Sequence, residues 1–205
     1  MPAKTGWLYK VLSNLSFLVL KAFFRFRISG AEHVPIDGGV LIASNHQSFL
    51  DPIIISASSR CPVAFMARDT LFKNFAFGWL IGRVNAFPVR RGAADREAIH
   101  EAINRLHGGW ALLIFPEGRR SLDGSLGELR PGPAMIAHRA DAPIVPAIIK
   151  GSYEAWPRTR KLFRFRPISI VYGEPIAPPA NAGRETYEKL SHDLHERLEM
   201  LMREG

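Results

Sequence analysis

The chain has 205 residues, of which 47% are hydrophobic and 22% are charged, and its formal net charge is +8. This length predicts one domain with a substantial hydrophobic core. The composition excludes a disordered chain and a protein with several membrane spans. The single cysteine, Cys61, excludes an internal disulfide framework, and we expect it to be a core thiol of a protein from a reducing compartment.

The positive charge is concentrated in two segments. Residues 1–31 contain five lysine and arginine residues and no acidic residue, and residues 158–166 contain five more, again without an acid. These two segments together carry +10, so the rest of the chain carries −2. Localised charge of this kind indicates surfaces that meet an anionic partner.

The first basic segment predicts an amphipathic helical arm at a membrane interface. Only ten uncharged residues separate Lys10 from Lys21, whereas a bilayer span needs about 20 apolar residues, so we do not expect the arm to cross. A secretory signal would fit the charge, but no small-residue cleavage site follows. Mixed aromatic, aliphatic and basic residues suit a helix among lipid headgroups, and the alternative is a helix packed on its own domain. We assign residues 1–30 to this arm and residues 31–205 to an α/β domain.

The second basic segment interleaves its cations with apolar side chains, among them Trp156, Leu162 and Phe163. This pattern leaves open a second membrane contact or a site for an acidic protein partner. No nucleic-acid-binding motif accompanies the charge, so we do not expect a nucleic-acid partner.

After the arm, short apolar runs alternate with helical patterns, which predicts a largely parallel central sheet flanked by helices. The predicted strands are residues 40–44, 63–67, 86–89, 110–115, 144–149 and 168–172. The predicted helices lie near residues 52–58, 71–80, 94–106, 133–139 and 185–203. In sheets of this kind, ligands bind beyond the carboxyl ends of the strands.

Polar residues follow three of these strands. His46 follows the first, Arg90 the third and Glu117 the fourth, so all three are expected in one crevice. Asp51 lies five positions after His46, where its carboxylate can fix the imidazole tautomer and leave the other ring nitrogen as a base. The alternative is that His46 is a structural histidine and that Asp51, which precedes Pro52, is a helix N-cap.

Residues 115–121 read Phe-Pro-Glu-Gly-Arg-Arg-Ser, which predicts an anion-binding turn. Gly118 permits close approach of the backbone to a ligand, and the two arginines offer guanidinium groups that match phosphate oxygens. The alternative is that Glu117 and Arg119 form a surface ion pair. Basic turns at residues 90–92 and 130–132 add to the expectation of an anionic substrate. The Gly-x-Ser-x-Gly elbow of serine hydrolases is absent, and no histidine or cysteine pair has metal-ligand spacing, so we expect neither an acyl-serine nor a metal.

With these motifs the chain resembles the glycerolipid acyltransferases, in particular the 1-acyl-glycerol-3-phosphate acyltransferases. The first family block is asparagine and histidine, four residues, then aspartate, which residues 45–51 match. The third block is Phe-Pro-Glu-Gly-Thr-Arg-Ser, which residues 115–121 match except that Arg119 replaces threonine. Residues 84–90 and 144–148 resemble the second and fourth blocks more loosely.

The resemblance implies acyl transfer from acyl-CoA or acyl-carrier protein to the sn-2 hydroxyl of 1-acyl-glycerol-3-phosphate, which makes phosphatidic acid without a cofactor or metal. Two alternatives stay open: another lysophospholipid or lyso-aminolipid acceptor, and a lipid-binding relative without catalysis. It also implies that His46 is the general base, that Asp51 orients it, and that the protein is peripheral or monotopic on the cytoplasmic face of a membrane.

The resemblance implies an acceptor site as well, in which two arginines hold the phosphate, the glycine assists them and the glutamate positions the glycerol. The extra cation in the third block makes the identity of the acceptor the open question. The substrate-binding residues expected on this basis are Arg90, Glu117, Gly118, Arg119 and Arg120.

Overall fold

The computed structural model describes residues 6–90 and 95–204. The start of the predicted arm at residues 1–5, the end of the basic turn at residues 91–92 and the first residue of the helix predicted at 94–106 lie outside the described residues. All other predicted elements lie within the described ranges.

Seven strands form one sheet in the order β1-β7-β6-β2-β5-β3-β4. All neighbouring strands run parallel except β6 and β7, which are antiparallel. This arrangement confirms the predicted α/β fold with a largely parallel sheet. The strands are β1 (Arg27–Ser29), β2 (Val40–Ser44), β3 (Val63–Arg68), β4 (Ala86–Val89), β5 (Ala111–Ile114), β6 (Ile144–Lys150) and β7 (Ser169–Tyr172).

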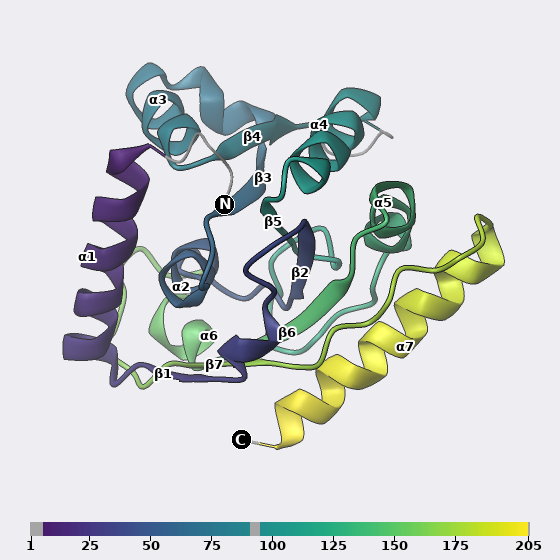
Figure 1. Ribbon diagram of the computed structural model, residues 1–205. Helices are drawn as coiled ribbons and strands as arrows, with labels where there is room; N and C mark the ends of the chain where they lie inside the picture. Colours follow the sequence, from purple (N-terminus) through teal and green to yellow (C-terminus); the bar gives the residue numbers. More distant parts are fainter. Residues whose placement is uncertain (1–5, 91–94, 205) are drawn as a thin grey trace.

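Helices cover both faces of this sheet (Figure 1). The central strands β2 and β5 are buried along their whole length, as expected of uninterrupted apolar runs in a parallel sheet. Residues of α1 and α2 pack on one face, and residues of α4, α5 and α7 pack on the other. The helices are α1 (Trp7–Phe24), α2 (Asp51–Ser58), α3 (Phe75–Arg83), α4 (Arg96–His107), α5 (Gly132–Ala140), α6 (Ser152–Ala155) and α7 (Arg184–Arg203), with short 3-10 helices η1 (Ala31–His33) and η2 (Asp69–Lys73).

Helix α1 and strand β1 form most of the predicted arm, and both pack on the domain. Tyr9, Leu20 and Phe24 of α1 are buried, although only 17% of the helix is buried in total. The Ser13 hydroxyl donates to the Ser56 carbonyl of α2 at 2.7 Å. Strand β1, which the sequence pattern did not predict, then pairs with β7. The boundary that we predicted at residue 30 therefore divides residues that share one sheet and one core.

The six predicted strands are confirmed with ends that differ by no more than one residue. The single helix predicted at residues 71–80 is wrong in its extent, because the chain forms η2 and then α3. Asn74 separates these two elements, and its Oδ1 accepts from the Phe77 N–H at 3.0 Å. This N-cap begins a new helix where the apolar pattern alone predicted continuity.

Candidate active site

Asn45 fixes the point where the chain leaves strand β2. Its fully buried side chain donates from Nδ2 to the Ile149 carbonyl at 2.9 Å and accepts at Oδ1 from the Ile149 N–H at 2.8 Å. These two bonds join the end of β2 to the neighbouring strand β6. His46, the next residue, therefore starts from a rigid position at the carboxyl edge of the sheet.

His46 and Asp51 form a direct pair. The distance from His46 Nδ1 to Asp51 Oδ2 is 2.8 Å, and the same oxygen accepts from the N–H groups of Gln47 at 2.6 Å and Ser48 at 2.7 Å. Because the carboxylate oxygen is an acceptor in all three contacts, Nδ1 of the neutral imidazole donates and Nε2 keeps its lone pair. This is the geometry of an oriented base.

Asp51 is not the N-cap that one interpretation of the sequence proposed. It is the first residue of α2, and Leu50 occupies the capping position without a side-chain bond. The Asp51 carboxylate points instead to the loop before the helix, where it accepts the backbone N–H groups described above. It is completely buried, so it reaches a substrate only through His46.

Phe115 holds the other side of the imidazole. Its ring lies parallel to the His46 ring, with centroids 3.8 Å apart and planes inclined by 10°. Phe115 follows β5, the strand next to β2, so the two residues leave the same edge of the sheet side by side. The sequence placed Phe115 in the turn motif but gave no sign of this stacking.

Glu117 is buried behind His46 and bonds to the backbone. Its Oε1 accepts from the His46 N–H at 2.7 Å, and its Oε2 accepts from the Gly127 N–H at 3.0 Å. Burial raises the pKa of the Glu117 carboxyl, and these two hydrogen bonds oppose the rise. The surface ion pair with Arg119, one interpretation of the sequence, is therefore not formed.

A cavity of about 960 Å³ begins at His46 and extends between α1, α2, β3 and α3. This volume is at the upper end of the range for ligand pockets. The walls away from His46 are mostly apolar and include Leu12, Ile53 and Ile81. His46 lines the cavity, whereas the carboxylates of Asp51 and Glu117 do not, so His46 is the one of these three that a substrate can contact.

Arginines line the same cavity near His46. Four of the five predicted substrate-binding residues are brought together there: Arg90, Gly118, Arg119 and Arg120. Two further arginines share the cavity, Arg68 at the end of β3 and Arg130 before α5. The sequence indicated residues 130–132 as a basic turn, but it gave no signal for Arg68, which lies in an otherwise apolar strand.

The arginines differ in their surroundings. The Arg90 side chain is 67% exposed and its guanidinium lies 3.1 Å from the Glu97 carboxylate, while the Arg90 backbone N–H donates to Asp95 at 2.8 Å. The Arg120 guanidinium lies over the Phe49 ring, 3.6 Å from its centroid. A Cβ atom at Gly118, where φ is +70°, would approach the Arg130 Nε to 3.1 Å, so Arg130 packs across this glycine.

Together these residues place the His46 imidazole between an apolar cavity and a group of guanidiniums, with Nδ1 engaged by Asp51 and Nε2 left for a substrate. The nitrogen can accept a proton from a hydroxyl, the guanidiniums can bind an anion on the same molecule, and the apolar walls can surround an aliphatic chain. The arrangement suits chemistry on an anionic, lipid-like hydroxyl compound.

Comparison with known proteins gives a consistent result. The family model Acyltransferase matches residues 25–150. The 1-acyl-sn-glycerol-3-phosphate acyltransferase of Bacillus subtilis is 28% identical over 90% of each chain. The chloroplastic enzyme of that name from Brassica napus is 27% identical over 75% of this chain, which spans 46% of its length. The crystal structure of the 1-acyl-sn-glycerophosphate acyltransferase PlsC from Thermotoga maritima superposes with a TM-score of 0.80 at 26% identity, over 96% of this chain and 80% of that one. The chain therefore belongs to the acyltransferase family.

Proposed function

We propose that the protein transfers a fatty acyl group from an acyl thioester to the sn-2 hydroxyl of 1-acyl-glycerol-3-phosphate, which makes phosphatidic acid. The observation that carries this proposal is the His46–Asp51 pair, which lies where the apolar cavity meets the arginines. The names of the Bacillus and Thermotoga relatives support the same substrate.

In the proposed mechanism His46 Nε2 removes the proton from the sn-2 hydroxyl as this oxygen attacks the thioester carbonyl. The tetrahedral intermediate then expels the thiolate as the C–S bond breaks, and the thiolate takes the proton from His46. Asp51 keeps Nδ1 as the donor and stabilises the imidazolium between the two steps. A positioned base contributes roughly 10²–10⁴-fold, so binding and electrostatic preorganisation supply the remainder. Proton and acyl transfer complete the reaction, so the proposal includes no metal or cofactor.

We propose that the acceptor phosphate binds at Arg120, Arg130 and the peptide of Gly118, and that the donor acyl chain occupies the apolar part of the cavity. Arg90 can join the phosphate site if its guanidinium moves from Glu97, a surface contact of small energy. The two backbone contacts of Glu117 support a role in positioning His46, in place of the glycerol contact that the resemblance implied.

The test is acylation of lysophosphatidic acid by wild type and His46→Ala, with acyl-CoA and acyl-carrier protein as separate donors. We expect the variant to lose at least about 10²-fold in kcat. His100→Ala is the matched control, because His100 is exposed on α4 and its Nδ1 lies 3.1 Å from the Asn104 Nδ2 on the same helix. Equal rates for wild type and His46→Ala would refute the mechanism.

The acceptor is tested separately, because Arg119 stands where the family block has threonine. Arg119 is exposed at the cavity, where an added cation can strengthen binding of a phosphate monoester. We expect lysophosphatidic acid to be preferred over lysophosphatidylethanolamine, and Arg119→Thr to raise KM for the acceptor without a change in kcat. A wild-type preference for the ethanolamine or another amino headgroup would favour the alternative acceptor class.

We also propose that α1 lies in a membrane interface, on the cytoplasmic face. It is the one helix in residues 6–90 and 95–204 whose length and mean hydropathy of 1.2 would suit a membrane span. However, Tyr9 and Leu20, near its two ends, both pack on the domain, which supports a helix parallel to the protein surface. Its outer face exposes large apolar side chains, including Leu15 and Leu18.

The interfacial role of α1 can be tested by sedimentation with vesicles of phosphatidylcholine and phosphatidylglycerol. We expect Leu15→Asp combined with Leu18→Asp to weaken binding, because both side chains are more than half exposed. Deletion of the whole arm is unsuitable, since it would remove β1 and the buried side chains of Leu20 and Phe24. Unchanged sedimentation would contradict the proposed contact.

A further inference from the structure

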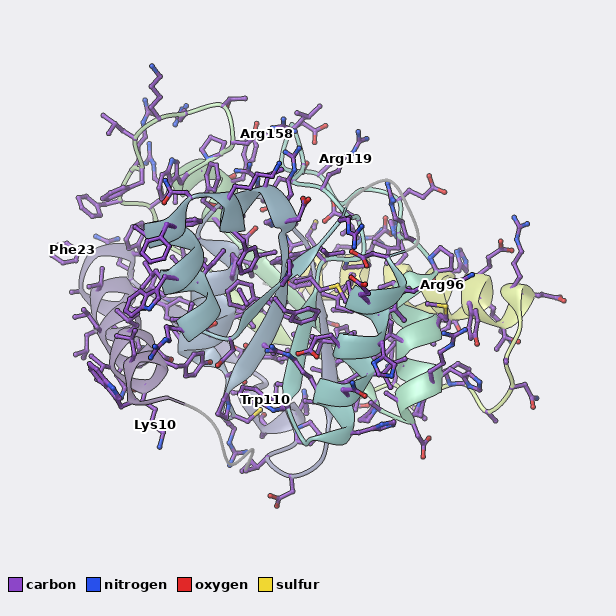
Figure 2. All side chains as sticks on the ribbon, turned by 90° about the horizontal axis from the view of Figure 1, so that it is seen from above. Lys10, Phe23, Arg96, Trp110, Arg119 and Arg158 are labelled. Atoms are coloured by element: carbon purple, nitrogen blue, oxygen red, sulfur yellow. The ribbon has the colours of Figure 1, made fainter. Side chains whose placement is uncertain are left out.

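The loop of residues 157–166 lies beside the carboxyl end of α1. The Phe165 ring stacks on Phe23 with centroids 5.3 Å apart and meets the edge of Phe24 at 5.5 Å. Figure 2 shows Phe23 at the outer edge of the molecule and the loop that carries Arg158 next to α1. The exposed side chains of the helix and the loop therefore form one continuous surface.

The five cations of this loop have no acidic partner in the described residues. None of them forms an ion pair there, whereas Arg184 and Arg203 on α7 each pair with a glutamate one turn away. All five side chains are exposed. A group of exposed cations without internal counter-charges favours an external anionic partner. The five are Arg158, Arg160, Lys161, Arg164 and Arg166.

Large apolar side chains are exposed between these cations. Leu162 is 79% exposed, Phe163 48% and Phe165 59%. Aliphatic and aromatic side chains mixed with arginine and lysine are typical of a segment that inserts at the boundary between lipid headgroups and acyl chains. An acidic protein would satisfy the charges, but it would leave unexplained the continuity of these apolar side chains with the exposed apolar face of α1.

We propose that the loop of residues 157–166 is a second membrane-contacting element, which binds anionic phospholipid headgroups and forms one lipid-facing surface with α1. The inference rests on the proposed interfacial position of α1 and extends it to a segment far away in the sequence. It concerns membrane binding alone, so it can be tested without substrate turnover.

The base of the loop leads directly to the candidate active site. Trp156 contacts the loop residue Phe163 at a centroid distance of 6.0 Å and Phe49 at 5.4 Å, and Phe49 lies under the Arg120 guanidinium. The Ser48 hydroxyl also donates to the Trp156 carbonyl at 2.8 Å. Phe49 and Arg120 line the cavity, so insertion of the loop would hold this end of the cavity near the headgroup layer, where the lysophospholipid acceptor resides.

The first test removes three of the cations by Arg158→Gln, Arg160→Gln and Lys161→Gln in the full-length protein. Binding is measured by sedimentation with vesicles of equal parts phosphatidylcholine and phosphatidylglycerol. We expect the apparent affinity to fall roughly a hundredfold, because each of the three basic residues near an anionic surface contributes about fivefold. Binding equal to wild type would overturn the inference.

The matched control removes the same charge from α7, which lies on the opposite side of the molecule from α1 (Figure 1). Arg184→Gln, Lys189→Gln and Arg203→Gln are exposed positions on that helix. We expect this variant to bind the vesicles like wild type. An equal loss in both triple variants would show that net charge alone governs binding, and it would overturn the assignment to the loop.

The second test reports the depth of the loop directly. Leu162→Cys is labelled with an environment-sensitive fluorophore, while the native Cys61 is buried and protected in the folded protein. We expect a blue-shifted emission on vesicles and quenching by lipids with spin-labelled acyl chains. Water-like emission from vesicle-bound protein would refute insertion of the loop while leaving the proposed role of α1 intact.

The alternative partner gives a different pattern of results. A triple variant that keeps vesicle binding but loses turnover with acyl-carrier protein, and not with acyl-CoA, would identify the loop as a donor-protein site and overturn the membrane assignment. Loss of vesicle binding with normal turnover of dispersed short-chain substrates would support the inference. These readouts are separate from the His46→Ala test, so either proposal can fail alone.

Discussion

His46 is held by three contacts that restrict different motions. The bond from Nδ1 to Asp51 fixes the direction of the ring, the parallel Phe115 ring fixes its plane, and the bond from its backbone N–H to Glu117 fixes the chain. Its side chain remains 12% exposed toward the cavity. A base held in this way loses little entropy when the substrate binds, which is the condition for efficient proton transfer.

The hydrogen bond between His46 and Asp51 predicts the effect of Asp51→Asn. An asparagine oxygen in the place of Oδ2 can still accept from His46 Nδ1 and from the Gln47 and Ser48 N–H groups, but the neutral amide supplies no negative charge to stabilise the imidazolium that forms during proton transfer. We expect kcat to fall roughly 10²–10⁴-fold with little change in KM. Steady-state kinetics measure both, and Asp123→Asn, at an exposed turn, is the control with the same chemical change. A loss confined to KM would argue against the orienting role.

Glu117 predicts a pH dependence of stability. Burial raises the pKa of its carboxyl above the value in the unfolded chain, so the folded protein binds this proton more tightly. The resulting stability is fully present below the unfolded pKa and is lost as the pH rises through the folded pKa. We therefore expect the difference in unfolding free energy between wild type and Glu117→Gln to decrease as the pH rises through that interval.

Urea denaturation at a series of pH values measures this difference. Glu128→Gln is the control, because Glu128 is exposed in the same region of the chain and should show no comparable trend. A difference between wild type and Glu117→Gln that is constant with pH would show that burial does not perturb the Glu117 carboxyl.

Among the elements, α1 has two roles, because its inner face belongs to the core and its outer face is exposed. The Tyr9 hydroxyl accepts from the Val63 N–H at 2.9 Å, and Val63 begins strand β3. Tyr9→Phe leaves this buried N–H without an acceptor, so we expect the free energy of unfolding to fall by about 1–3 kcal/mol. Equilibrium denaturation measures the loss.

Tyr153→Phe is the control for this prediction, because the Tyr153 hydroxyl donates to the carbonyl of Leu122 in an exposed loop. Water can replace that bond, so the expected cost is much smaller. Equal effects of the two substitutions would contradict the docking of α1 on the domain.

The sequence predicted the elements well where the local pattern decides the structure. Strands β2 and β6 are short, continuous apolar runs, and this pattern alone was enough to predict buried strands. Strand β1 was missed because it has only three residues and no clear apolar pattern. It becomes a strand by pairing with β7, which is more than 130 residues away in the sequence. The carboxylate of Asp51 was ambiguous for the same reason, since the sequence could not show which N–H groups it accepts.

At the scale of the whole molecule, strand order decides which predicted site residues meet. Strands β2 and β5 are parallel neighbours, so His46 and Glu117 leave the sheet together and form a hydrogen bond. Strand β4 lies at the edge, two positions from β5, and Arg90 therefore reaches the cavity from its side. The sequence predicted one crevice for all three residues, and His46 and Arg90 do line the same cavity, whereas Glu117 does not line it.

The cavity is a property of the whole fold, because α1, α2, α3 and β3 each contribute a wall. His46 lies at the carboxyl end of the parallel strands, whereas the bond from Tyr9 to the start of β3 places the first turns of α1 toward the opposite end. Leu12, one turn after Tyr9, lines the cavity in this distal region. An acyl chain that enters beside His46 would therefore reach Leu12 with its terminal carbons.

This direction predicts how chain length can be changed. Leu12→Trp adds volume at the distal end, so we expect turnover of long-chain acyl donors to fall while shorter donors keep their rates, because overpacking excludes the terminal methylenes. Leu15→Trp is the control, since Leu15 is 53% exposed on the outer face of the same helix and does not line the cavity. Competition between donors of different length measures the shift. An equal loss of turnover for donors of all lengths in Leu12→Trp would place the acyl chain elsewhere, and so would the same change in length preference in both variants. Only an acyl chain that ends at Leu12 makes the effect depend both on the length of the donor and on the face of α1 that carries the tryptophan.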